Sequence, residues 1–122
     1  MSAAQDFFYF LYDSTRRHHI PRVCIENPIP HKYMYGNGLI EKYTQIIHPW
    51  QFGHMEQKPT CLWLKNLPLL KETNNVKEEM KKLPANKRQR IHYMAPSETR
   101  SRERSVTYTG IANAMAEQWG SL

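Results

Sequence analysis

The sequence predicts an α/β fold in which about three strands are flanked by an N-terminal and a C-terminal helix. Three short apolar or β-branched runs each end at proline or asparagine, which is typical of strands closed by turns. Residues 3–17 and 110–119 instead carry apolar residues at helical spacing. Because 122 residues suit one domain, we expect a single domain over residues 1–122.

The first half of the chain is expected to hold one helix and one strand. Phe7, Phe10 and Leu11 fall at helical spacing within residues 3–17, and Pro21 prevents the helix from continuing. A strand is predicted at residues 22–26 because the run is β-branched and is followed by an Asn-Pro turn signal.

Two further strands are predicted at residues 43–48 and 60–65, stopped by Pro49 and Asn66. Nearly continuous apolar strands usually lie in a sheet that is covered on both faces. At least one of these three strands would have an open edge, which is an aggregation hazard unless something pairs with it. The strand pattern therefore indicates that part of the sheet is supplied from elsewhere.

The C-terminal region is predicted to be a long loop followed by a helix. Residues 66–104 look irregular, apart from a short charged helix around residues 76–83. Residues 110–119 form the final helix, since Ile111, Met115 and Trp119 recur every four residues and the alanines between them allow close packing.

Positive charge is concentrated in one segment of the chain. The net charge is +6, and residues 71–104 carry ten Lys or Arg against five acidic residues, so they contribute +5. We therefore describe residues 71–104 as a basic, irregular loop or insertion. Such a segment can attract phosphates, or it can simply be a solvated surface, and both interpretations remain open.

Several classes of protein are not expected. The chain has no apolar run near the ~20 residues that span a bilayer and no signal-peptide pattern, so we expect a cytoplasmic protein that does not bind membranes. Cys24 and Cys61 lie in apolar runs and are interpreted as packing residues. No Cys or His spacing is typical of a zinc site, so no metal is expected.

Two groups of residues are candidates for binding a nucleobase or phosphate. Glu26 and Asn27 follow a predicted strand, where ligands bind in open α/β sheets, and a carboxylate there can bond the amine and ring nitrogen of a flipped base. Alternatively, they are a strand-end charge and a turn residue. The loop between the second and third strands offers stacking and polar groups. The residues expected to contact nucleic acid are Trp50, Gln51, His54, Gln57, Lys58, Arg100, Arg102 and Arg104.

Four ordered segments, residues 26–33, 48–54, 58–68 and 104–120, resemble a family of small proteins from phages and large DNA viruses. That family is described as DNA cytosine-5 methyltransferase-like, and the resemblance covers nearly the whole chain, with residues 71–90 its weakest part. It implies a partial Rossmann-like methyltransferase sheet. It also implies a host-cytoplasmic location for a viral protein.

The resemblance assigns roles to residues that match the family's motifs. Glu26 and Asn27 resemble the catalytic Glu-Asn motif whose glutamate bonds the target cytosine, although Pro28 replaces the usual valine. Gln57 and Lys58 resemble the motif that contacts the base and the nearby backbone. The final helix resembles the motif beside S-adenosylmethionine, which makes Asn113 the candidate cofactor-binding residue.

Two family motifs have no counterpart in this sequence. A glycine-containing turn cradles S-adenosylmethionine and a Pro-Pro-Cys supplies the nucleophile, and in the family both precede the Glu-Asn strand. Cys24 is a poor substitute because a thiol among apolar neighbours is unreactive. We therefore expect the C-terminal half of a methyltransferase-like fold, truncated or split, which neither binds the cofactor nor transfers methyl groups by itself.

The expected partners follow from this interpretation. They are DNA and either a second copy, forming a homodimer, or a chain that holds the N-terminal half. The alternative function is a catalytically inactive nucleic-acid-binding or virion-associated module. A third hypothesis, a protein-interaction adaptor, relies on the open sheet edge alone.

Overall fold

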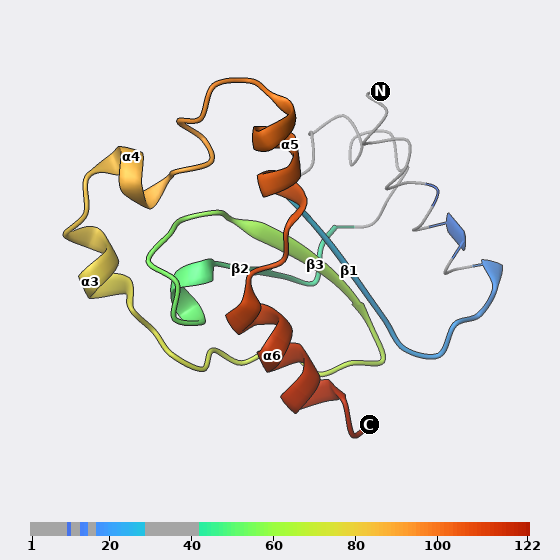
Figure 1. The fold of residues 1–122 in the computed structure, drawn as a ribbon. Helices are drawn as coiled ribbons and strands as arrows, with labels where there is room; N and C mark the ends of the chain where they lie inside the picture. Colours follow the sequence, from blue (N-terminus) through green and yellow to red (C-terminus); the bar gives the residue numbers. More distant parts are fainter. Residues whose placement is uncertain (1–9, 11–12, 15–16, 29–41) are drawn as a thin grey trace. The chain divides into compact units, whose positions relative to one another are not determined.

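The fold is described from a computed structural model, which covers residues 10, 13–14, 17–28 and 42–122 (Figure 1). The chain divides into two compact units. The first consists of residues 1–47 and 60–69, and the second of residues 48–59 and 70–122. The chain therefore leaves the first unit at residue 48, returns at residue 60 and leaves again at residue 70.

The first unit contains a three-stranded sheet. Its strands are β1 (Val23–Pro28), β2 (Gln45–Ile47) and β3 (Thr60–Lys65), in the order β1-β3-β2 (Figure 1). Strand β3 is antiparallel to both neighbours, so β1 and β2 run parallel to each other. Four consecutive residues of β3, from Thr60 to Trp63, are buried, which means that this strand is covered on both faces.

The α/β class and the three predicted strands are confirmed, but the Rossmann-like sheet is not, because every neighbouring pair is antiparallel. Parallel neighbours need a crossover, usually a helix. The connection from β2 to β3 holds only the short 3-10 helix η1 (Pro49–Gln51). A continuous apolar run marks a central strand in either kind of sheet, so the pattern of β3 alone does not reveal strand direction.

Strand β1 extends beyond the predicted range. It continues through Asn27 and Pro28, which were predicted to form a turn. Pro28 is compatible with this position because β1 is an outer strand of the described sheet, where a missing backbone N–H is tolerated. Within the described residues, β1 and β2 each pair on one side only.

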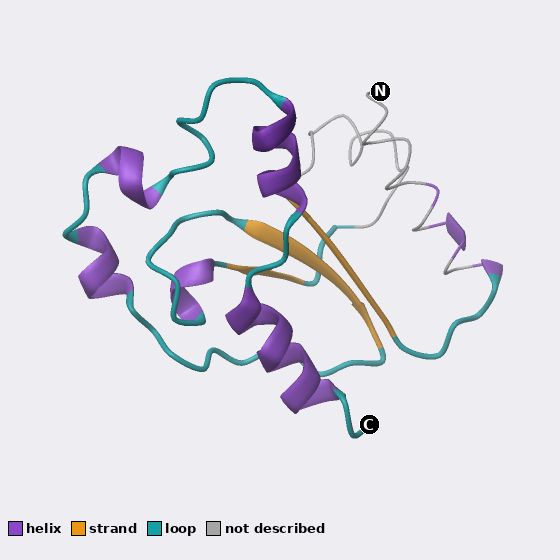
Figure 2. Ribbon diagram, viewed as in Figure 1, coloured by secondary structure: helices purple, strands orange, loops and turns teal. Residues whose placement is uncertain are grey.

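Besides η1, the described part of the second unit contains four α-helices joined by loops (Figure 2). They are α3 (Lys77–Lys81), α4 (Ala85–Arg88), α5 (Glu98–Ser105) and α6 (Thr109–Trp119). Helix α3 lies inside the predicted range 76–83, and α6 matches the predicted final helix. Helices α4 and α5 lie in the segment that was expected to be irregular.

Helix α5 escaped prediction because it has no apolar face. None of its eight residues is buried, so the sequence lacks the spacing that marks an amphipathic helix. It begins instead with a local signal, since the Ser97 hydroxyl accepts a hydrogen bond from the Arg100 N–H.

Most of the helix predicted at residues 3–17 lies outside the described residues. Those that are described within it, Phe10, Asp13, Ser14 and Arg17, are helical. Arg17 Nε lies 2.8 Å from Asp13 Oδ2, an ion pair at helical spacing. No helix among the described ranges is long and apolar enough to cross a membrane.

Each unit has its own buried side chains. Those described in the first unit are Ile47, Thr60, Cys61, Leu62 and Trp63. Those described in the second unit are Pro49, Phe52, Leu70, Met80, Ile91, Ile111 and Ala114. In α6 the predicted stripe is only partly buried, since Ile111 is covered whereas Met115 and Trp119 are half-exposed.

Candidate nucleic-acid interface

Glu26 and Asn27 lie within β1, near its carboxyl end. Glu26 is opposite Leu62 and Asn27 is opposite Cys61 in the neighbouring strand. Successive side chains of a strand point to opposite faces, so these two residues serve different faces of the sheet. Both are half-buried. The structure therefore separates two residues that the sequence places together.

The face that carries Glu26 also carries a second polar side chain. Leu62 is paired with Glu26 on one side and with Gln45 on the other, so the three residues form one row across the sheet. Leu62 is fully buried, and Gln45 is half-buried. Two strand spacings separate the outer residues by about 10 Å.

Gln45 was not recognised from the sequence. It begins β2, nineteen positions after Glu26 in a chain whose strand register is not visible in the sequence. The only available signal was a polar residue at the start of an otherwise apolar strand. Register decides which polar residues share a face, and register is set by pairing.

The two thiols of the first unit are poorly suited to nucleophilic attack. Burial, followed by the charge of Glu26, raises the pKa of Cys24 to about 12. Burial also raises the pKa of Cys61, which is fully buried. Both residues therefore stay protonated at neutral pH, as their apolar neighbours predict.

Trp50 is in contact with other side chains of the second unit. Its ring stacks on His48 with 5.1 Å between ring centres, and Lys77 Nζ lies 5.0 Å from the centre of the indole. Its carbonyl accepts a hydrogen bond from the Val76 N–H. Burial, then the charge of Lys77, lowers the pKa of His48. The stacking face expected to meet a base thus already packs within the protein.

Gln51 joins η1 to the segment that precedes α3. Its side-chain Oε1 accepts a hydrogen bond from the His48 N–H at 2.8 Å. Its carbonyl accepts from the N–H groups of Thr73 and Asn74, each at 3.1 Å. Gln51 therefore holds the loop in place from both its side chain and its backbone.

His54 anchors the first turn of α6. Its Nε2 accepts a hydrogen bond from the Gly110 N–H at 2.9 Å, and its ring centre lies 5.0 Å from that of Tyr108. Gly110 has to be glycine, because a Cβ there would collide with the carbonyl oxygen of Phe52 and lie 2.9 Å from the His54 Nε2.

Gln57 and Lys58 connect the same loop to α4 and α5. The Gln57 N–H donates to the Arg88 carbonyl at 2.6 Å, and Gln89 Nε2 donates to the Gln57 side chain at 3.1 Å. Lys58 Nζ donates to the Arg104 carbonyl at 2.5 Å and lies 5.6 Å from the ring centre of Tyr108.

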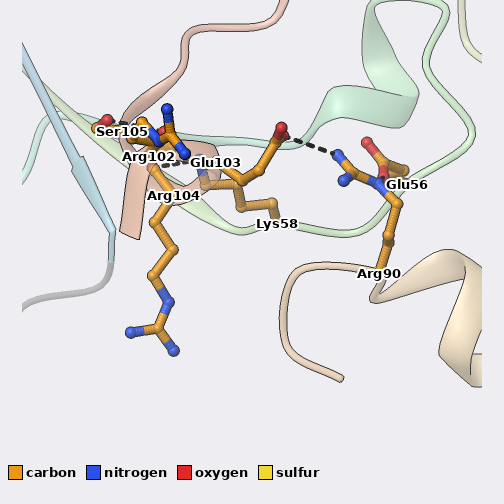
Figure 3. A network of polar contacts seen from close by, with 7 residues as sticks. All are labelled: Glu56, Lys58, Arg90, Arg102, Glu103, Arg104 and Ser105. Atoms are coloured by element: carbon orange, nitrogen blue, oxygen red, sulfur yellow. Dashed lines mark hydrogen bonds and ion pairs between the residues drawn. The ribbon is translucent and has the colours of Figure 1, made fainter. Parts of the chain in front are cut away.

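Arg90 links the loop to α5 through two carboxylates (Figure 3). Its Nε lies 2.6 Å from Glu56 Oε1, and its Nη2 lies 3.3 Å from Glu103 Oε2. Burial, then a hydrogen bond with Glu56, raises the pKa of Tyr108 beside this pair. We call Glu56, Arg90 and Glu103 the Arg90 clasp.

The three arginines of α5 have different surroundings. Arg100 is half-buried and donates from Nη1 to the Met94 carbonyl at 3.2 Å. Arg102 and Arg104 are exposed, and Figure 3 shows the Arg104 guanidinium extending away from the clasp. Arg102 and Arg104 are therefore available to a phosphate.

Asn113, the candidate cofactor residue, is exposed on α6. A single exposed carboxamide does not form a cradle for a molecule as large as S-adenosylmethionine, so we assign no step to that cofactor. Among the described residues, no group of three or more His, Cys, Asp or Glu is arranged to hold a metal ion.

The predicted loop residues thus contact other residues of the second unit, at positions 73–77, 88–89 and 104–110. Trp50, Gln51, His54 and Gln57 hold the second unit together through the contacts above, and their binding of nucleic acid stays a prediction. No family model matches the chain, and no curated protein or solved structure is significantly similar to it.

Proposed function

We propose that this chain recognises a cytosine in DNA, as the base-recognition part of a DNA cytosine-5 methyltransferase-like protein. In this proposal, the cofactor loop and the nucleophile are provided by residues other than the candidate site residues named above. Recognition of the base is the task of the first unit in this proposal.

The observation that carries the proposal is the row of Glu26, Leu62 and Gln45 on one face of the sheet. A carboxylate accepts a hydrogen bond from the exocyclic amine of cytosine, whereas it repels the carbonyl oxygen that thymine has at the same position. The carboxamide of Gln45, on the same face of the sheet, can donate to or accept from the other edge of the base. The ordered resemblance to the methyltransferase-like family supports the same role for Glu26.

The state of the cysteines supports recognition rather than methyl transfer. Methylation at carbon 5 needs a thiolate that attacks carbon 6. Cys24 is the thiol on the face of Glu26, and its pKa of about 12 keeps it protonated. In this proposal the attacking group is supplied by a residue other than Cys24 or Cys61.

The proposal is tested by comparing two duplexes that differ at one position. In each, either cytosine or thymine faces an abasic site, which lowers the cost of flipping the base out. We expect the intact chain to bind the cytosine duplex about tenfold more tightly, equivalent to about 1.4 kcal/mol. Glu26→Ala should abolish the preference, and Glu117→Ala, which removes an exposed acid from α6, should retain it. Equal affinity of the unmodified chain for both duplexes would contradict the proposal.

A catalytically inactive nucleic-acid-binding or virion-associated module is the second candidate. It is favoured by the exposed cations of the second unit together with the protonated thiols. The two functions differ in one outcome. A methyltransferase part yields labelled DNA when it is mixed with radiolabelled S-adenosylmethionine and a chain carrying the N-terminal half, whereas an inactive module binds DNA and leaves it unlabelled.

A further inference from the structure

Residues 81–88 comprise the last residue of α3, the connection to α4 and α4 itself, and they form a cationic part of the basic segment 71–104. We call it the basic corner. It contains Lys81, Lys82, Lys87 and Arg88 and no acidic residue, so it carries +4 within eight positions. The three lysines are exposed, and Arg88 is half-buried.

The backbone of the basic corner is held at both ends. Met80, directly before it, is fully buried, and the Leu83 N–H donates to the Met80 carbonyl. At the other end, the Arg88 carbonyl accepts a hydrogen bond from the Gln57 N–H at 2.6 Å, and the Arg88 N–H donates to the Pro84 carbonyl. The lysines therefore project from a fixed turn rather than from a free loop, which reduces the entropy lost when they bind a ligand.

The acids nearest the corner in sequence are Glu78 and Glu79 of α3, and both are exposed. Glu56 and Glu103 are both paired with Arg90 in the clasp. Glu78 lies 3.8 Å from Lys81, but its side chain is 82% exposed, and such pairs contribute little. Among the residues that the structure describes, Lys82 and Lys87 take part in no ion pair.

We propose that the basic corner binds the phosphate backbone of DNA, with Lys82 and Lys87 each neutralising one phosphate. The proposal rests on the proposed function and deepens it, because it adds phosphate contacts to the recognition of a base. Lysine is a compact point charge on a flexible stem, which suits phosphates whose positions vary with sequence. Phosphate contacts of this kind position a protein on DNA without specifying the base.

The test is the salt dependence of binding to an undamaged duplex. Each phosphate contact releases condensed counterions and adds about 0.9 to the slope of log affinity against log salt concentration. We expect Lys82→Gln/Lys87→Gln to lower the slope by about 1.8 between about 50 and about 200 mM salt, with an affinity loss on the order of tenfold at the low end. Lys82→Arg/Lys87→Arg keeps both charges and should keep the slope.

The matched control removes the same charge elsewhere. Lys65→Gln/Lys71→Gln neutralises two other exposed lysines and should leave the slope within about 0.5 of its original value. A slope unchanged in Lys82→Gln/Lys87→Gln, with folding verified by circular dichroism, would overturn the role of the corner. That result leaves the Glu26 proposal intact. If instead the slope falls in Lys82→Gln/Lys87→Gln but the unmodified chain shows no preference for cytosine, base recognition is overturned and the phosphate-binding role of the basic corner is kept.

Discussion

Gly110 is the residue where α6 comes closest to the loop that precedes β3. Its N–H donates to His54 Nε2, and a side chain there would meet the carbonyl of Phe52. We expect Gly110→Ala to destabilise the protein by about 1–3 kcal/mol, because overpacking forces backbone shifts. Denaturant unfolding measures the change, and Thr109→Ala, an exposed neighbour, should have little effect. Unchanged stability in Gly110→Ala would mean that the His54 contact is dispensable.

His48 makes stability depend on pH in a defined direction. Burial and Lys77 lower its pKa in the folded state, so as the pH falls the unfolded state takes up a proton first, near its unperturbed pKa of about 6.5. The contribution is thus present above about pH 6.5 and is lost as the pH falls through the folded-state pKa.

His48→Phe removes the titrating group and keeps a ring to stack on Trp50. We expect this variant to lose less stability than the unmodified protein between about pH 7.5 and about pH 5.5. Urea unfolding at both pH values measures the difference, and all other histidines are common to both proteins. Identical pH dependence of the two proteins would show that His48 is readily protonated in the fold.

Helix α5 depends on polar contacts because it has no buried residue. The Arg90 clasp and the bond from Lys58 to the Arg104 carbonyl attach it to the loop. We expect Arg90→Ala to remove the ion pairs of Glu56 and Glu103 and to free α5 locally, while global stability falls by at most about 1 kcal/mol, since the arginine is 45% exposed.

Hydrogen exchange of the amides in α5 is the measurement that isolates this effect. Exchange should accelerate in residues 98–105 of Arg90→Ala and remain unchanged in α6. Arg90→Lys should recover only part of the protection, because an ammonium lacks the fork that reaches two carboxylates. Arg102→Ala, whose side chain is exposed on the same helix, serves as the control.

The elements differ in how well the sequence predicts them, and the reason is whether they bury an apolar pattern. Strand β3 and helix α6 were predicted because a run of buried residues, or a repeat at every fourth position, is visible in the sequence. Helix α5 was missed because its only marker is the Ser97 cap, and a serine three residues before an arginine is common in loops as well.

The composition of the chain predicts where positive charge lies but not which cations are paired. Residues 71–104 carry most of the net charge, but their cations have different partners in the structure. Arg90 and Arg100 are bound to groups of the protein, whereas Lys82, Lys87 and Arg102 are exposed. Composition therefore predicts attraction to a polyanion in general. The contacts within the fold decide which cations are exposed and can bind that polyanion.

In loop 48–59 the sequence correctly indicated residues that make specific contacts, but it did not show that these contacts are made within the protein. Its aromatic, amide and imidazole groups were expected to face a ligand, but Trp50, Gln51 and His54 contact segments 20 or more positions away in the chain. Side chains that suit a base also suit a protein interior, since both demand stacking surfaces and paired polar atoms.

The sequence by itself determined the α/β class, the three strands, the final helix and the location of the positive charge, because each depends on local periodicity or composition. The tertiary structure alone decided that β3 runs antiparallel between β1 and β2, and that Gln45 rather than Asn27 shares a face with Glu26. It also decided which cations are paired. These properties depend on strand register and on contacts between distant segments, and neither can be read from the pattern of neighbouring residues.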